Sequence, residues 1–187
     1  MIPNMEFWMI FRPQTADIFG KLLKTYVNDA IMIRQMEVIA MNTVKFIKLD
    51  ENAIVPSYGS ECAAGADLYA CNGGEDIKIN PGETVIVHTG IAMEIPDGYA
   101  GMIFARSGIA LKRGLAPANK VGVIDSDYRG EIMVALHNHS KETQVVGDKE
   151  RVAQLVVMPY LRVNFVEAES LEDTERAAGG FGSTGTK

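Results

Sequence analysis

The stretch ETVIVHTGIAMEIPDGYAGMIFA, residues Glu83 to Ala105, decides the fold class. Its two halves, ETVIVHTGIAMEI and YAGMIFA, are rich in β-branched and apolar residues, and the turn signal PDG at Pro96 separates them. The stretch shows almost no helical periodicity. It therefore predicts short strands joined by tight turns.

The same pattern fills the chain from Met41 onward. Further strand-like segments are NTVKFIKL, GEIMVALHNH, RVAQLVVM and LRVNFVEA, and further turn signals are NGG at Asn72 and NPG at Asn80. A parallel α/β sheet would need long crossover helices, which this region lacks. We therefore predict an all-β sandwich or barrel-like fold.

Both ends of the chain differ from this β region. Apolar residues between Ile18 and Ile31 recur with helical spacing, which predicts an amphipathic helix. That helix either docks on a partner or membrane or is an appended leader before a start at Met41, and its mixed-charge polar face favours the leader. After Phe165 the chain becomes polar and then glycine-rich, which predicts a mobile arm. The predicted division is an extension at 1–41, a β-domain at 42–167 and an arm at 168–187.

Composition limits the function. The chain has 187 residues, 47% of them hydrophobic and 22% charged, with a net charge of −6. That charge argues against a general nucleic-acid binder but leaves room for a small anionic ligand. The only cysteines, Cys62 and Cys71, form no disulfide framework, which favours a reducing cytoplasm. The sequence has no run of 18 apolar residues, so we expect no membrane span.

One segment interrupts the β pattern. RSGIALKRG, Arg106 to Gly114, predicts a helix of one or two turns that Ser107 caps and Gly114 ends. The free N–H groups of such a helix, beside Arg106, would bind an anion. The alternative is a plain capped connector.

A second segment places acids between strands. In GVIDSDYRGE, Gly122 to Glu131, an apolar strand runs into Asp125 and Asp127. We expect a hairpin with these acids at its turn and the next strand starting at Gly130. Turns favour Asp for conformational reasons, but a carboxylate on a rigid hairpin can also act as a general base.

Three isolated signals have structural alternatives. Asp67 lies among small residues and Gln154 lies within an apolar strand, so each can be a satisfied structural residue. The glycines of GGFGSTGTK, which starts at Gly179, match G-x-G-x-x-G, but no helix follows, so the dinucleotide-binding reading fails. His137 and His139 share a strand face and are interpreted as surface histidines, since a metal site needs more ligands.

Five segments in one order resemble a known family. AGADLYA, ARSGIALKRGL, GVIDSDYRGEI, ERVAQLV and GGFGSTG resemble motifs one to five of the trimeric deoxyuridine triphosphatases (dUTPases), across Thr43 to Gly185. The resemblance implies a distorted β jelly roll, of β-clip type, and a homotrimer with active sites between subunits. It implies Mg²⁺-assisted hydrolysis of dUTP to dUMP and pyrophosphate, which keeps uracil out of DNA and supplies dUMP.

The resemblance also assigns roles. Asp125 matches the general base that activates water against the α-phosphorus, Tyr128 packs on deoxyribose, and Asp67 helps hold the hydrated metal. The uracil-reading hairpin corresponds to Asn119 and the backbone of Val121, Gly122, Val123 and Ile124. The phosphate contacts correspond to Arg106, Ser107, Gly108 and Gln154. The fifth motif, which closes over the substrate, corresponds to Arg176, Phe181, Gly182, Ser183 and Thr184.

Two departures and two alternatives accompany the resemblance. Lys149 and Glu150 stand where the fourth motif usually has Gly-Asp, which predicts a longer turn there. Ala177 stands where Gly commonly follows the fifth-motif arginine, which would be strained at positive φ. A dCTP deaminase of the same fold and a non-catalytic dUTP-binding regulator are the alternative functions.

Overall fold

The structure is a computed structural model that describes residues 24–29, 31–32, 43–174 and 177–179. Residues 24–29 and 31–32 are helical, which confirms part of the predicted N-terminal helix. No helix in these ranges is long and apolar enough to cross a membrane.

The rest of the described chain is almost entirely strand and turn, which confirms the all-β prediction. One short helix, α2, spans Ser107–Arg113. The strands are β1 (Lys45–Lys48), β2 (Ser57–Tyr58), β3 (Ala66–Tyr69), β4 (Ile77–Ile79), β5 (Thr84–Val87), β6 (Ile91–Glu94), β7 (Tyr99–Phe104), β8 (Leu115–Pro117), β9 (Gly122–Ile124), β10 (Val134–Asn138), β11 (Gln144–Val146) and β12 (Arg151–Pro159).

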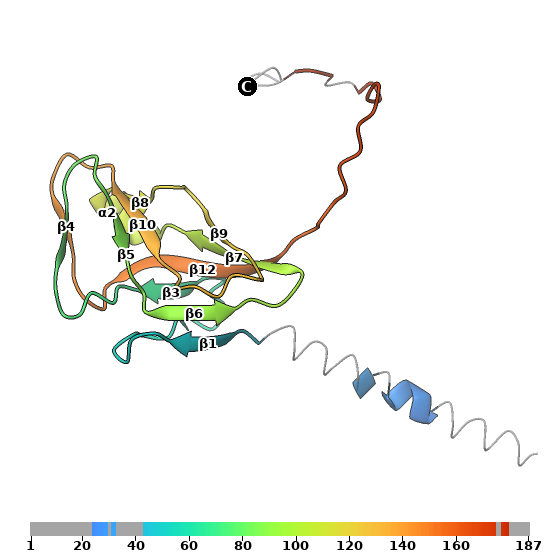
Figure 1. The fold of residues 1–187 in the computed structure, drawn as a ribbon, viewed down its shortest axis with the longest axis horizontal. Helices are drawn as coiled ribbons and strands as arrows, with labels where there is room; N and C mark the ends of the chain where they lie inside the picture. The colour runs from blue at the N-terminus through green and yellow to red at the C-terminus, as the bar shows by residue number, and fades with distance from the viewer. Residues whose placement is uncertain (1–23, 30, 33–42, 175–176, 180–187) are drawn as a thin grey trace, which may run out of the picture.

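The largest sheet is built around β12. It has five strands in the order β2-β3-β12-β7-β9, and β12 pairs antiparallel with both β3 and β7. A second sheet has the order β5-β10-β8, and β1-β6 and β11-β4 form two-stranded sheets. Figure 1 shows β12 crossing the domain and the chain leaving its end as an extended arm.

The core lies between these sheets. The fully buried aliphatic side chains include Leu68, Ile79, Ile91 and Leu136, which come from four different sheets, and Ile132, which lies just before β10. Removing any one of them would leave a cavity that costs about 2–5 kcal/mol of the free energy of unfolding. This shared core holds rigid the strand ends that carry the candidate site.

The predicted turns form where the glycine signals place them. Gly82 and Gly98 have φ of 75° and 79°, the left-handed region that a residue with a Cβ adopts at a cost. The N–H of Tyr99 donates to the Pro96 carbonyl at 3.1 Å and closes the PDG turn. The turn therefore separates β6 from β7, as the opening stretch predicts.

Two strand predictions are wrong. β9 pairs with β7 whereas β10 pairs with β5 and β8, so the acid-bearing segment crosses between sheets and is no hairpin. β10 also begins at Val134 and not at Gly130, because the Glu131 side chain is hydrogen-bonded to the backbone of Thr89 and Gly90. Residues 161–168, predicted as a strand, lie in the extended arm and pair with no strand among the residues that the structure describes.

The turn before β12 explains the first departure from the motif pattern. Lys149 has φ of 62°, so it occupies the left-handed conformation that a glycine adopts without strain. Its N–H donates to the Ala70 carbonyl at 2.9 Å, and the N–H of Glu150 donates to the Gly147 carbonyl at 3.2 Å. These hydrogen bonds hold Lys149 in the left-handed conformation, so the departure from glycine is accommodated at this position by the backbone.

Candidate functional site

Three neighbouring strands bring predicted residues into one row. Gln154 on β12 lies opposite Asp67 on β3 and opposite Phe104 on β7. Directly opposed residues of antiparallel strands share a face of the sheet. Since β7 continues into α2, Arg106 follows this row closely along the chain. The Nε2 of Gln154 donates to the Ala105 carbonyl at 2.9 Å and joins β12 to the start of α2.

Asp67 lies between two arginines at the end of this row. The Nε of Arg106 donates to its Oδ1 at 2.6 Å, and the Nη1 of Arg151 donates to its Oδ2 at 3.2 Å. Asp67 is 8% exposed, so both charge-assisted hydrogen bonds are largely shielded from water. Removing this carboxylate would leave two guanidinium groups beside each other without a counter-charge. The carboxylate therefore holds both arginines in place.

The start of α2 offers backbone donors beside this cluster. Arg106 is the N-cap residue, with φ of −87° and ψ of 132° and no side-chain cap, and Ser107 is the first helical residue. The predicted cap is therefore displaced by one position, and the Ser107 hydroxyl is not used for capping. The first N–H groups of a helix have no intrahelical acceptor, so Ser107 and Gly108 can donate to an anion. Gly114 has φ of 66° and ends the helix, as predicted.

A small cavity collects the predicted uracil-reading residues. It has a volume of about 90 Å³ and is lined by Asn119, Gly122, Val123, Ile124 and, around them, Ile103, Pro117, Met133, Val134 and Ala135. The turn that leads into it is closed by the N–H of Lys120, which donates to the Pro117 carbonyl at 3.0 Å. Val121 does not line the cavity. Its N–H instead donates to the Asn119 carbonyl at 2.8 Å.

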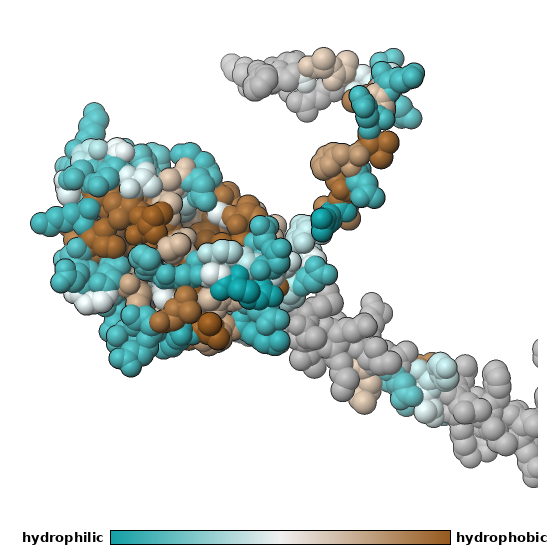
Figure 2. Space-filling view, in the orientation of Figure 1, coloured by the Kyte–Doolittle hydropathy of each residue, from teal (hydrophilic) through white to brown (hydrophobic). Residues whose placement is uncertain are grey.

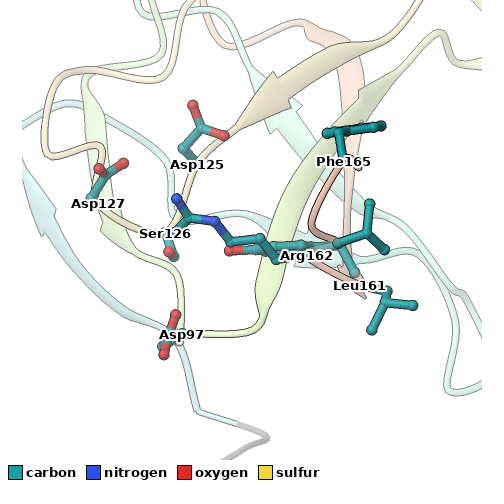
Figure 3. A pocket seen from close by; sticks show the side chains of 9 residues that line it. Asp97, Asp125, Ser126, Asp127, Leu161, Arg162 and Phe165 are labelled. Carbon is teal, nitrogen blue, oxygen red and sulfur yellow. The ribbon is translucent and has the colours of Figure 1, made fainter. Parts of the chain in front are cut away.

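Asp125 follows β9 and faces a larger hollow. This hollow of about 840 Å³ lies between the Asp125–Asp127 loop and the start of the arm. Figure 3 shows Arg162 of the arm pointing toward Ser126 and Asp125. Asp125 is exposed, so its carboxylate can reach a water. The Nη1 of Arg129 donates to the Ser126 carbonyl at 2.6 Å and stiffens the loop.

Tyr128 completes this loop and depends on a glycine. Its hydroxyl donates to the Glu131 carbonyl at 3.0 Å, and it is 39% exposed. A Cβ at Gly130 would lie 2.6 Å from the Tyr128 Cζ, which is closer than carbon atoms pack. Gly130 therefore leaves room for the aromatic ring.

Replacing that glycine tests the placement of the ring. We expect Gly130→Ala to displace the Tyr128 ring, and the resemblance, which places that ring on deoxyribose, then predicts an increase of about tenfold in KM for dUTP. Steady-state kinetics would measure this. Gly59→Ala is the matched control, since a Cβ there meets no atom within 4 Å and the residue needs no positive φ. An unchanged KM in the Gly130 variant would contradict this placement.

Glu131 is a residue of the site region that the sequence analysis did not single out. Its Oε1 accepts from the N–H groups of Thr89 at 3.1 Å and Gly90 at 2.7 Å, and its Oε2 lies 2.8 Å from the His88 Nδ1. Burial alone would raise the pKa of Glu131, but these hydrogen bonds outweigh burial and lower the pKa below its ordinary value of 4.5. The carboxylate thus ties the Asp125 loop to the turn between β5 and β6.

The lowered pKa of Glu131 has a consequence for stability. A carboxyl whose pKa is lower in the folded state stabilises that state above its unfolded pKa, and the contribution disappears as pH falls through the folded pKa. We expect Glu131→Gln to lose about 1 kcal/mol of stability at pH 7 and to converge with wild type below pH ~4. Thermal unfolding at several pH values would show this. A variant deficit that does not change with pH would contradict it.

The two groups of predicted residues lie far apart in one chain. Ile124 lies opposite Gly101 on β7, whereas Gln154 lies opposite Phe104, farther along the same strand. β9 and β3 are also separated by β7 and β12. Strand spacing and residue rise place Asp125 roughly 15–20 Å from Asp67. One chain therefore does not bring the Asp125 loop and the arginine cluster together.

The fifth-motif residues Arg176, Phe181, Gly182, Ser183 and Thr184 lie outside the described residues. Ala177 is described and has φ of 41°. This is the positive φ at which the sequence analysis expects an alanine to be strained. An alanine there carries backbone strain of about 1 kcal/mol.

Comparisons with known proteins agree on one family. The dUTPase family model matches residues 51–185. The deoxyuridine 5'-triphosphate nucleotidohydrolase of Nautilia profundicola is 49% identical over 142 residues, which cover 76% of this chain and 98% of that relative. The same enzyme of Hydrogenobaculum sp. is 48% identical over 140 residues, which cover 75% and 96%.

Solved structures agree with the sequence relatives. A point mutant of the dUTPase of Staphylococcus bacteriophage 80alpha, solved with dUpNHpp, has a TM-score of 0.67 at 27% identity over 77% of this chain and 99% of that one. The dUTPase of phage phi11 of S. aureus, in which a structural Mg(II) ion is coordinated, has a TM-score of 0.63 at 25% identity over 71% and 100%.

Proposed function

Because the chain belongs to the dUTPase family and hydrolyses dUTP to dUMP, we propose that Asp125 is the general base and that the active site is shared between subunits of a homotrimer. The observation that carries this proposal is the joining of Asp67, Arg106 and Gln154 into one cluster that excludes Asp125. A water activated by Asp125 would attack the α-phosphorus, and pyrophosphate would leave. Removal of dUTP would keep uracil out of DNA and supply dUMP.

The arginine cluster is the proposed phosphate site. Arg106 and the N–H groups of Ser107 and Gly108 supply positive charge and donors, and Gln154 has one amide hydrogen beyond the bond to Ala105. A triphosphate carries about four negative charges near neutral pH, so clustered donors stabilise the charge that develops in hydrolysis. No acidic residue lies in the first turn of α2 to oppose it.

The 90 Å³ cavity is the proposed base-binding site. Asn119 and the backbone of Val121 to Ile124 would read the polar edge of uracil, and Tyr128 would pack on deoxyribose. Polar readout of a buried base discriminates strongly, because a wrong edge leaves hydrogen-bonding groups unpaired. The fifth motif (Arg176, Phe181, Gly182, Ser183 and Thr184) would close over the substrate and exclude water.

Mg²⁺ is the proposed cofactor, and Asp67 would contact the ion only through a metal-bound water. The described residues contain no group of three or more His, Cys, Asp or Glu side chains that could enclose a metal. Mg²⁺ keeps several waters and binds substrate phosphates in such sites, so one nearby carboxylate is sufficient. Each Asp67 oxygen accepts one arginine N–H and retains a lone pair for a metal-bound water. The ion would neutralise part of the phosphate charge.

The arm supports assembly into trimers. Leu161 is 84% and Phe165 is 95% exposed in a single chain, and Figure 2 shows apolar residues along the arm. Contact with a neighbouring subunit would bury these side chains. The distance between Asp125 and the arginine cluster supports a site that a second subunit completes. We also propose that the enzyme works in the cytoplasm, where the free thiols of Cys62 and Cys71 stay reduced.

A nucleotide panel tests the proposal. Purified protein should release pyrophosphate from dUTP far faster than from dCTP, dTTP or UTP, and Mg²⁺ removal should slow it strongly. Ammonia release from dCTP would identify the deaminase alternative. Binding of dUTP without pyrophosphate release would identify the regulatory alternative.

A further inference from the structure

The far end of α2 is tied to the turn before β12. The Nη1 of Arg113 donates to the Glu150 Oε1, its Nη2 donates to the Val145 carbonyl, and its Nε donates to the Gln144 Oε1 at 3.2 Å. The other oxygen of Glu150 accepts from the Gly147 N–H at 3.1 Å. Glu150 therefore joins the helix to a turn that it also braces.

The same turn leads directly to the arginine cluster. Arg151 follows Glu150, and its Nη1 donates to the Asp67 Oδ2 at 3.2 Å. The carbonyl of Arg151 accepts a hydrogen bond from the Arg106 Nη1 at 3.4 Å. Both ends of α2 are thus attached to adjacent residues, Arg106 to Arg151 at the start of β12 and Arg113 to Glu150 in the turn before it. This arrangement fixes where the first turn of the helix lies relative to Asp67.

α2 buries little of its own surface. It has seven residues, and Ile109 is its only buried side chain, while Leu111 is 88% exposed. Hydrogen bonds hold the residues that flank it, from the Gln154 Nε2 to the Ala105 carbonyl and from the His139 N–H to the Gly114 carbonyl. With so little side-chain burial, the polar contacts at its two ends contribute strongly to its direction.

We propose that Glu150 and Arg113 are positioning residues that aim the first turn of α2 at the triphosphate. The proposal rests on the phosphate site proposed above. Glu150 stands where the related motif commonly has aspartate, and its additional methylene lets the carboxylate reach the Arg113 guanidinium. The two side chains are about one-third and one-quarter exposed, so their pairing contributes little to global stability. The Glu150–Arg113 pair instead affects the affinity for dUTP.

Kinetics of paired variants test this proposal. We expect Glu150→Ala to raise KM for dUTP about tenfold with kcat and the thermal midpoint little changed, because the phosphate donors are misaimed. Glu150→Gln should recover most of the affinity, since its amide oxygen still accepts from Arg113. The double variant E150A/R113A should lose less affinity than the sum of the two single losses, because the two residues share one contact.

A matched ion pair elsewhere supplies the control. Lys45 and Glu94 pair at 3.4 Å across β1 and β6, away from α2, so Glu94→Ala should leave KM unchanged. Equal KM values in the Glu150 and Glu94 variants would overturn the proposal, as would a lowered thermal midpoint with unchanged KM. Arg106→Ala tests the phosphate site separately: normal dUTP affinity in that variant would refute the proposed function itself.

Discussion

Asp125→Asn should lose between about 10²- and 10⁴-fold in kcat while its affinity for dUTP stays close to wild type. Asparagine has nearly the same shape but accepts no proton from water at neutral pH. Asp125 is exposed after β9 and lies roughly 15–20 Å from Asp67 in the described part of its own chain, so its loss leaves the proposed phosphate contacts untouched. Single-turnover kinetics and equilibrium titration with dUTP would separate the two effects.

The neighbouring acid provides the control for that experiment. Asp127 lines the same hollow two residues later, so Asp127→Asn removes an equal charge at nearly the same place. We expect this variant to keep most of its turnover. Comparable losses in both variants would indicate a general electrostatic effect, and turnover near wild type in the Asp125 variant would remove Asp125 from the role of base.

The sequence was sufficient to name the components of the phosphate cluster, because the order of the five motifs resembles the family and local patterns place Gln154 in a strand. Asp67 and Gln154 belong to alternating apolar segments that pair edge to edge, so their side chains emerge in one row. Gly114 likewise marks the helix end through its left-handed conformation. Such features depend on a few neighbouring residues, and pattern reasoning captures them.

Long-range partners were beyond that reasoning. The segment from Asp125 to Glu131 was predicted as a hairpin turn because turn signals indicate local bending of the chain. The choice of strand partner depends on the whole core, and β9 and β10 enter different sheets. Glu131 drew no attention in the sequence, and Glu150 drew attention only as a departure from the fourth motif. Their partners, the loop at Thr89 and the helix end at Arg113, are 42 and 37 residues away in sequence.

Mixed trimers should regain activity that neither parent variant has. Asp125→Asn and Arg106→Ala each remove one half of the proposed site, so each homotrimer should be nearly inactive. The separation of roughly 15–20 Å within one chain implies that these halves meet across a subunit boundary. Co-expression with two different affinity tags, followed by tandem purification, yields trimers that contain both variants.

Geometry fixes the size of the recovery. Around a three-fold axis, any trimer that contains both variants has one boundary at which an intact Arg106 faces an intact Asp125, so turnover should reach about a third of wild type. Trimers of Asp125→Asn carrying both tags are the control and should stay inactive. If the tandem-purified mixed species also stayed inactive, Asp125 and Arg106 would have to act within the same subunit. The chain would then have to bring the end of β9 to the start of α2 by a rearrangement of the five-stranded sheet.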